Sequence, residues 1–189
     1  MGKTLRFVLG DQLSRGISCL RRLAKDDIVL MCEVAEEATY VRHHRKKIAF
    51  LFSAMRHFAS DLRDAGNAVD YLEFGEAEDV RSFTDALRKA VAAHGVSRVI
   101  ATEAAEYRVL QMQRGWADEF GIEVELRADD RFIATPEEFA EWADGRKELR
   151  MEYFYREMRR KTGYLMDANG GPEGGQWNYD KDNRESLPD

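Results

Sequence analysis

The fold is set near the start of the chain, by Thr4-Leu5-Arg6-Phe7-Val8-Leu9-Gly10-Asp11-Gln12-Leu13. The run 4–9 favours a β-strand and stops at the polar turn that follows it. A second apolar run, 28–32, stops in the same way at Glu33. The segment between them has room for about two helical turns at 17–24. Because parallel strands need a crossover connection, these residues predict a strand, helix, strand unit with two buried parallel strands.

The same alternation continues to about residue 126. Residues 44–65 carry apolar side chains at spacings of three and four, which is typical of a helix that buries one face. Three further strands are predicted at 69–74, 99–102 and 122–126, and the remaining helices at 80–94 and 109–120. Right-handed crossovers leave few topologies for this pattern. We therefore predict an α/β fold, with a Rossmann-like five-stranded parallel sheet of order 3-2-1-4-5 and helices on both faces.

The composition of the chain changes after Pro136. Helices are predicted at 137–143 and 151–161, and the residues from 163 onward contain five of the 14 glycines. Such a segment is typical of an extended linker. We predict two parts, an α/β domain at 1–135 and a helical segment with linker at 136–189, which leads toward a C-terminal domain that is not in this chain.

Composition excludes several classes of function. The chain has 189 residues, a formal net charge of −6 and no apolar run long enough to span a membrane, so a cytoplasmic location is expected. Two cysteines, Cys19 and Cys32, cannot build a disulfide framework or a cysteine-rich metal site. Nonspecific nucleic-acid binding by the whole surface is also disfavoured, because phosphate contacts need clustered cations.

Polar side chains gather where the predicted strands end. Ligands of open parallel sheets bind beyond these ends, where the strand order reverses. The polar residues at these ends, suited to hydrogen-bond a polyhydroxylated or heteroaromatic ligand, are Asp11, Gln12, Glu33, Glu103, Glu106, Tyr107 and Arg108, and Tyr40 and Tyr107 are candidate stacking surfaces. Loops after strands are polar for solubility as well, and that alternative stays open.

Other motifs give weaker indications. Cations crowd residues 42–47 at the predicted start of the long helix, and either Glu36 and Glu37 or a bound anionic or polar ligand would compensate them. Residues 150–161 hold five cations, which suit phosphate contacts or, more commonly, a solvated helix face. The sequence contains no Gly-x-Gly-x-x-Gly or Walker phosphate loop, no Gly-x-Ser-x-Gly elbow, and no His or Cys spacing suited to a metal.

Several blocks together carry a resemblance to a known family. They are Leu9-Gly10-Asp11-Gln12-Leu13, Cys32-Glu33-Val34, His43-His44, Lys46-Lys47-Ile48-Ala49-Phe50, Phe52-Ser53-Ala54-Met55-Arg56-His57-Phe58, Met151 to Lys161, and Gly174-Gly175-Gln176-Trp177-Asn178-Tyr179-Asp180. In this order they resemble the deoxyribodipyrimidine photolyase-related proteins, which include the bacterial six-four photolyases and the iron-sulfur cryptochromes.

The resemblance implies a DNA-repair or light-sensing flavoprotein in two parts. The N-terminal domain holds an antenna pigment, 6,7-dimethyl-8-ribityllumazine or a related molecule, and a C-terminal helical domain holds FAD and a 4Fe-4S cluster. This chain resembles the first part only, so the lyase activity of the family is not expected of these residues alone. By the same resemblance, Asp11, Cys32, Glu37 and Tyr40 are expected to contact the pigment. The implied partners are the pigment, the helical FAD domain and, only through the full-length protein, damaged DNA; no membrane partner is expected.

Two alternatives to an antenna domain remain open. One is a stand-alone flavin- or lumazine-binding protein without repair activity. The other is a nucleotide-dependent transferase that uses the same crevice, although the glycine fingerprint of dinucleotide sites is missing.

Overall fold

The computed structural model describes residues 2–76 and 79–180, and the chain divides into two units. Unit 1 is Met1–Arg131 and unit 2 is Phe132–Asp189. Within the described residues, no helix is both long enough and apolar enough to cross a membrane.

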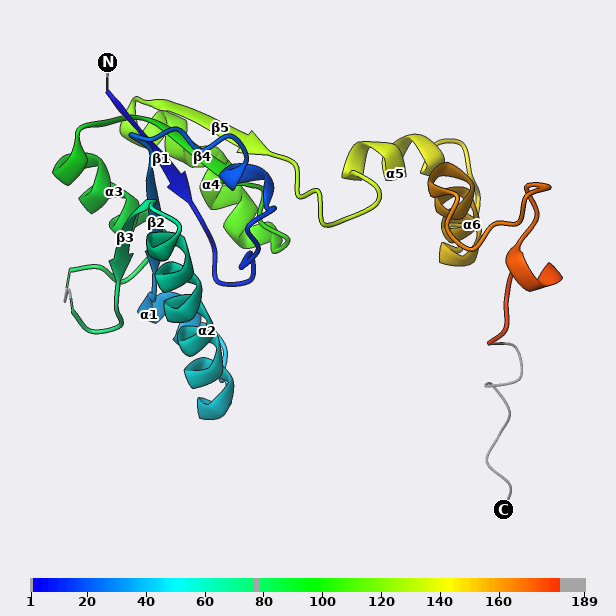
Figure 1. Ribbon diagram of the computed structural model, residues 1–189, viewed down its shortest axis with the longest axis horizontal. Helices are drawn as coiled ribbons and strands as arrows, with labels where there is room; N and C mark the ends of the chain where they lie inside the picture. Colours follow the sequence, from blue (N-terminus) through cyan, green and yellow to red (C-terminus); the bar gives the residue numbers. More distant parts are fainter. Residues whose placement is uncertain (1, 77–78, 181–189) are drawn as a thin grey trace. The chain divides into compact units, whose positions relative to one another are not determined.

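Unit 1 is a five-stranded sheet with helices on both faces (Figure 1). Every neighbouring pair of strands is parallel, and the order β3-β2-β1-β4-β5 confirms the predicted Rossmann-like topology. The strands are β1 (Lys3–Phe7), β2 (Ile28–Cys32), β3 (Ala68–Leu72), β4 (Val96–Thr102) and β5 (Glu123–Arg127). The reversal of strand order lies at β1, because β2 and β4 pair with its two sides.

Two hydrophobic cores cover the two faces of the sheet. Because successive side chains of a strand point to opposite faces, Leu30 joins the core under α3 (Phe83–His94) and α4 (Tyr107–Phe120), whereas Val29 and Met31 join the other core. That second core lies under α2 (Arg45–Asp64). The continuous apolar run of β2 is thus explained by burial on both faces.

The predicted helix at 17–24 is wrong. Only a short 3₁₀ turn, η1 (Ser18–Leu20), forms there. The guanidinium of Arg6 is buried beneath this segment, where it pairs with Asp27 at 2.7 Å and donates to the carbonyl oxygens of Cys19 and Arg22. Satisfying a buried cation in this way takes carbonyl groups that a regular helix would need for itself.

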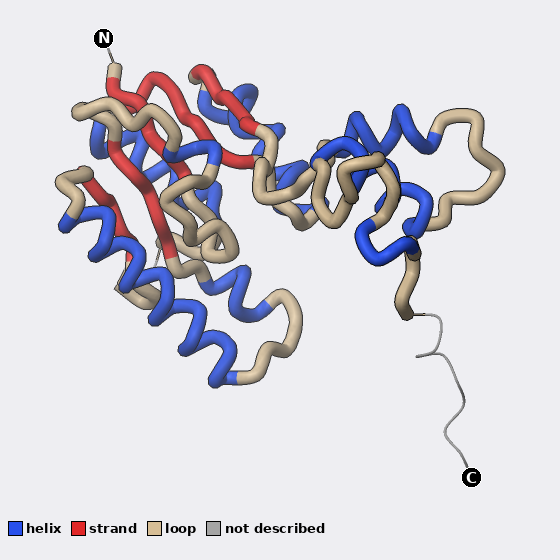
Figure 2. Tube along the Cα trace, turned by 45° about the vertical axis from the view of Figure 1, so that its right-hand side comes forward, coloured by secondary structure: helices blue, strands red, loops and turns tan. Residues whose placement is uncertain are grey.

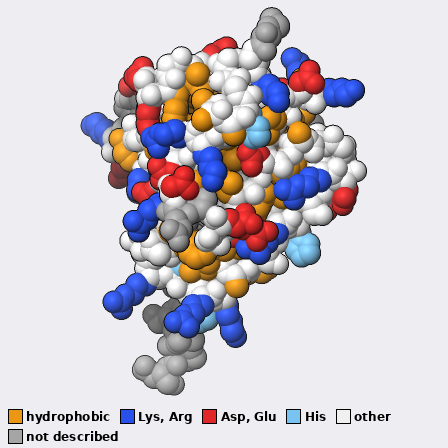
Figure 3. Space-filling view, turned by 90° about the vertical axis from the view of Figure 1, so that its left-hand side faces the viewer, with side chains coloured by type: hydrophobic (Ala, Val, Ile, Leu, Met, Phe, Trp, Pro, Cys, Tyr) orange, Lys and Arg blue, Asp and Glu red, His pale blue; other side chains and the backbone are white. Residues whose placement is uncertain are grey.

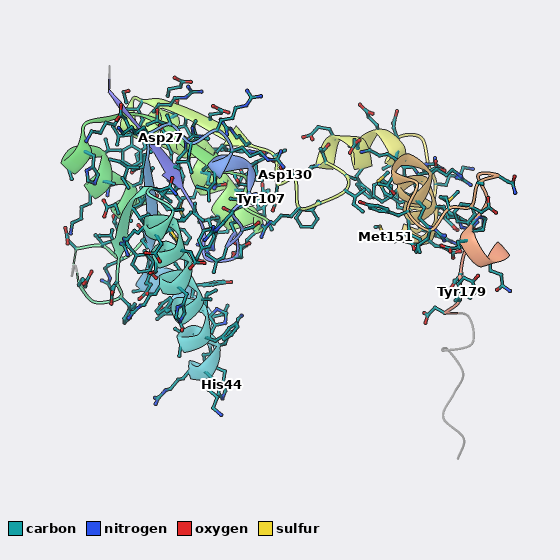
Figure 4. All side chains as sticks on the ribbon, viewed as in Figure 1. Asp27, His44, Tyr107, Asp130, Met151 and Tyr179 are labelled. Carbon is teal, nitrogen blue, oxygen red and sulfur yellow. The ribbon has the colours of Figure 1, made fainter. Side chains whose placement is uncertain are left out.

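A short helix that the sequence did not predict, α1 (Ala35–Thr39), follows β2. The long helix α2 begins after it at Arg45, with His44 as its N-cap, and Gly66 lies just past its end in the left-handed conformation. In Figure 1 the N-terminal half of α2 extends beyond the strands, and His44 lies at the far end of the helix (Figure 4).

Unit 2 contains α5 (Pro136–Ala143), α6 (Met151–Thr162) and the short turn η2 (Glu173–Gly175) (Figure 2). A capping box between Thr135 and Glu138 starts α5, as its sequence favours. The rings of Phe139, Trp142 and Phe154 pack against one another with centroids 5.1–5.6 Å apart. The predicted linker begins at Gly163, the C-cap of α6, and contains η2; its last part, 181–189, lies outside the described residues.

The surface carries charges of both signs. On the face shown in Figure 3, Lys and Arg side chains alternate with Asp and Glu side chains around small apolar patches. This face is therefore not uniformly basic.

Candidate ligand-binding site

Unit 1 contains a cavity of about 640 Å³ at the carboxyl ends of its central strands. Leu9 and Gly10 follow β1, Cys32 ends β2, and Ala104 follows β4, and all four line the cavity. The cavity thus lies where the strand order reverses, the position at which open parallel sheets bind ligands. Its volume lies within the usual range of small-molecule sites, about 300 to 1,000 Å³.

Most of the cavity wall is apolar. One helix, α2, contributes Ile48, Leu51, Phe52 and Met55 at helical spacing. Phe83 and Val109, on the opposite helices α3 and α4, close the other side. A ligand that fills this space therefore needs a flat or extended apolar part.

Three polar side chains of the cavity wall contact one arginine. Arg108, in the first turn of α4, donates from Nη2 to both carboxylate oxygens of Glu37 at 2.8 Å and from Nε to Glu106 at 3.0 Å. Its guanidinium also lies 4.6 Å from the centre of the Tyr40 ring. Glu37, Tyr40 and Glu106 all line the cavity, so Arg108 connects side chains from both sides of it.

Burial controls the protonation of two groups in the wall. Burial raises the pKa of Glu37; the hydrogen bonds from Arg108 lower it, without cancelling the rise. Burial also raises the pKa of the Cys32 thiol, and the nearby carboxylates of Asp70, Glu37 and Glu33 add to that rise. The thiol is therefore protonated at neutral pH and presents an uncharged surface to the cavity.

Basic side chains reach the same cavity from the start of α2. His43 and Lys47 both line it, and Lys47 Nζ lies 3.4 Å from His43 Nδ1. The wall therefore includes carboxylates and cations in addition to its apolar surface, which suits a ligand with several hydrogen-bonding groups at one end.

Five of the nine sequence-predicted site residues line the cavity: Asp11, Cys32, Glu37, Tyr40 and Glu106. Tyr107 does not line it, and this residue is 76% exposed. Glu103 is also outside the lining, and its backbone NH donates to the Arg127 carbonyl.

Gln12 and Glu33 lie next to the cavity but are occupied by the protein itself. Gln12 is fully buried; it accepts from the Leu9 NH and donates to the carbonyl oxygens of Thr102 and Glu103. It thus joins the ends of β1 and β4. Glu33 accepts four hydrogen bonds from protein groups: two from Arg56, one from the Tyr71 hydroxyl and one from the Phe74 NH.

Sequence reasoning did not find how the site residues pair with one another. Arg108 is among the polar residues predicted after the fourth strand, yet only the folded chain brings it to Glu37, 71 positions away in the sequence. The sequence shows His43 and Lys47 only as part of a cationic cluster, and the fold places both in the cavity wall. Among the described residues, no group of three or more His, Cys, Asp or Glu side chains is arranged to hold a metal ion.

Fold and cavity together define a Rossmann-like α/β domain with a small-molecule-sized cavity at its strand-order reversal. The sequence pattern of the family described as deoxyribodipyrimidine photo-lyase-related protein matches residues 6–189, and the chain belongs to this family. A (6-4) photolyase from Agrobacterium fabrum is 50% identical over 98% of this chain, which spans 37% of that protein's length. An uncharacterised protein of Acanthamoeba polyphaga mimivirus is 23% identical over 82% of this chain and 78% of its own length.

Proposed function

We propose that unit 1 is the antenna-chromophore domain of a DNA-repair or light-sensing flavoprotein, and that its cavity binds 6,7-dimethyl-8-ribityllumazine or a related pigment. The observation that carries the proposal is the cavity of about 640 Å³ at the strand-order reversal of a photolyase-related chain. When bound, such a pigment absorbs near-ultraviolet or blue light and passes its excitation to a flavin.

The residues of the cavity fit this class of ligand. The flat ring would lie against the apolar wall of α2, chiefly Leu51, Phe52 and Met55, and beside the neutral thiol of Cys32. The hydroxyl groups of a ribityl chain would hydrogen-bond at the polar side, where Glu37 and Asp11 line the cavity. The protein would hold the pigment and exclude water from it, without doing chemistry on it.

Lesion repair is not part of the proposal for this chain by itself. FAD and the 4Fe-4S cluster of the full-length proteins would belong to a C-terminal helical part. The cysteines of this chain do not suit a cluster, because Cys19 belongs to the core on one face of the sheet and Cys32 to the core on the other. Damaged DNA would be bound only by the complete protein.

A binding titration tests the proposal. The purified chain, titrated with 6,7-dimethyl-8-ribityllumazine and followed by pigment fluorescence, should bind at one saturable site. Ala105→Trp places a large ring in the lining of the cavity at an exposed position and should abolish binding. Ala49→Trp is the matched control, because Ala49 is exposed on α2 and does not line the cavity. No binding at tens of micromolar, or equal binding by both variants, would refute the assignment.

A second function is a stand-alone pigment-binding protein without repair activity. The relative from Acanthamoeba polyphaga mimivirus supports this alternative. This chain covers 78% of that protein's length but only 37% of the photolyase, so a related protein exists that is not much longer than this chain. Sequencing the gene beyond the codon of Asp189 distinguishes the two. A downstream helical reading frame with four cysteines supports the antenna domain, and its absence supports the stand-alone protein.

A further inference from the structure

One wall of the cavity is a segment that is only lightly attached to the domain. This segment, the strap, consists of residues 35–44, which connect β2 to α2 and contain α1. Four strap residues line the cavity: Glu37, Ala38, Tyr40 and His43. No strap residue is buried, so the strap is not held in place by a core of its own.

Few polar contacts tie the strap to the rest of unit 1. Its Glu36 NH donates to the Arg81 carbonyl at 3.0 Å. Among side chains, the hydrogen bonds of Thr39, His43 and His44 stay within the strap or reach only the start of α2. The remaining side-chain hydrogen bonds, ion pairs and ring contacts between the strap and other described elements all involve Arg108.

Arg108 makes three kinds of contact with the strap. It forms the two hydrogen bonds to Glu37, it lies over the Tyr40 ring, and its Nη1 is 3.8 Å from Glu36. Glu106 accepts from its Nε and so orients the guanidinium toward the strap. These contacts use the planar guanidinium group, whose several N–H donors point in fixed directions; the single ammonium group of a lysine cannot reproduce them.

The position of Arg108 does not serve its own helix. A cation in the first turn opposes the helix dipole, and the first turn of α4 contains no acidic residue that would balance it. The carboxylates that do balance it belong to the strap and to the N-cap, Glu106. The electrostatic benefit of Arg108 therefore lies in its contacts across the cavity.

We propose that Arg108 is a clasp that holds the strap closed over the cavity and sets the rates at which a ligand enters and leaves. The inference rests on the proposed function, because it takes the cavity to be the pigment site. Arg108 does not line the cavity, so it acts as a positioning residue through Glu37 and Tyr40. Its side chain is 35% exposed, so the clasp can open without unfolding of the domain.

Stopped-flow fluorescence with 6,7-dimethyl-8-ribityllumazine tests the clasp. In Arg108→Gln, both the association and the dissociation rate should rise about tenfold, as expected for the loss of a charge-assisted contact. The dissociation constant should change much less than either rate. Arg108→Lys should give rates between those of the original sequence and those of Arg108→Gln, because it keeps the positive charge but not the planar guanidinium group. Arg114 is an exposed cation on the same helix and has no ion pair among the described residues. Arg114→Gln should therefore bind and release lumazine at the same rates as the original sequence.

Hydrogen exchange of the ligand-free chain provides a test that needs no pigment. Arg108→Gln should speed the exchange of strap amides, with no change in the core strand β4. A strap-confined increase supports the clasp, and unchanged strap exchange overturns it. The clasp is also overturned if Arg108→Gln binds and releases lumazine at the same rates as the original sequence. It is overturned as well if only the dissociation rate of Arg108→Gln rises, so that its affinity falls. If lumazine does not bind the unchanged chain at all, the proposed function fails, while the exchange experiment still decides the clasp.

Discussion

Two glutamates that follow β2, four residues apart, have pKa values shifted in opposite directions. Glu33 and Glu37 each pair with one arginine through two hydrogen bonds, Glu33 with Arg56 at 2.6 and 2.8 Å and Glu37 with Arg108 at 2.8 Å. The side chain of Glu33 is 0% exposed and that of Glu37 is 23% exposed. Nevertheless, the pKa of Glu33 is lowered and that of Glu37 is raised.

The number of donors explains this reversal. Burial raises the pKa of Glu33, but the hydrogen bonds from Arg56, the Tyr71 hydroxyl and the Phe74 NH together outweigh it. Glu37 has only the hydrogen bonds from Arg108 to oppose burial, and Glu36 and Glu106 add repulsion. A saturated carboxylate fixes the structure around it, whereas a carboxylate with spare acceptor capacity is available to a ligand.

The largest expected effect comes from removing the charge of Glu33. Glu33→Gln replaces one acceptor oxygen by an amide donor that faces Arg56, Tyr71 and the Phe74 NH. We expect the free energy of unfolding to fall by about 3 kcal/mol, the scale of breaking a buried charge pair. Urea denaturation measures it. Glu73→Gln is the control, because Glu73 pairs with the same Arg56 on the surface, and a loss of equal size there would contradict the special role of Glu33.

A second comparison uses two side chains one turn apart on α2. Met55 is 3% exposed between the cavity and the core, whereas Leu51 is 37% exposed at the cavity wall. Met55→Ala should lower the free energy of unfolding by about 2 kcal/mol. This is the lower end of the range for truncating a buried methionine to alanine, because one side of the Met55 side chain already faces the cavity. Leu51→Ala should cost less, and equal losses in urea denaturation would mean that the cavity wall is packed as tightly as the core.

Removing the charge of Glu37 should change stability little. Glu37→Gln keeps one acceptor for Arg108, and the pair is partly exposed, so the free energy of unfolding should change by less than about 1 kcal/mol. Lumazine binding should weaken in the same variant, since Glu37 lines the cavity. A stability loss as large as that of Glu33→Gln, with unchanged binding, would assign Glu37 a structural role instead.

The sheet and its order were predictable from sequence, because a fully buried parallel strand requires an apolar run and each run ends at polar residues. The region of Ser18 was not predictable, because the buried Arg6 that reshapes it has the same appearance in sequence as an exposed arginine. At the site, the difference between Glu33 and Glu37 depends on arginines 23 and 71 positions away. Spacing along the chain carries no information on such partners, so both carboxylates were expected to contact ligand.

The smallest effect, and the sharpest test of the comparison, is the pH dependence of stability. The folded-state pKa of Glu33 lies below its ordinary value of 4.5, so its stabilising contribution is present above pH 4.5 and is lost as the pH falls through the lowered pKa. The folded-state pKa of Glu37 lies above 4.5, so its contribution is present below pH 4.5 and is lost as the pH rises through the raised pKa.

The two variants should therefore change the pH profile in opposite directions. Compared with the unchanged chain, Glu33→Gln should lose less stability on acidification, and Glu37→Gln should lose slightly more, because the favourable protonation of Glu37 in the folded state is gone. Urea denaturation at a series of pH values from about 7 to about 3.5, on both sides of the ordinary glutamate pKa, measures both slopes. Changes of the same sign in the two variants would mean that the glutamates share one environment, and the distinction between a structural and a ligand-accessible carboxylate would fail.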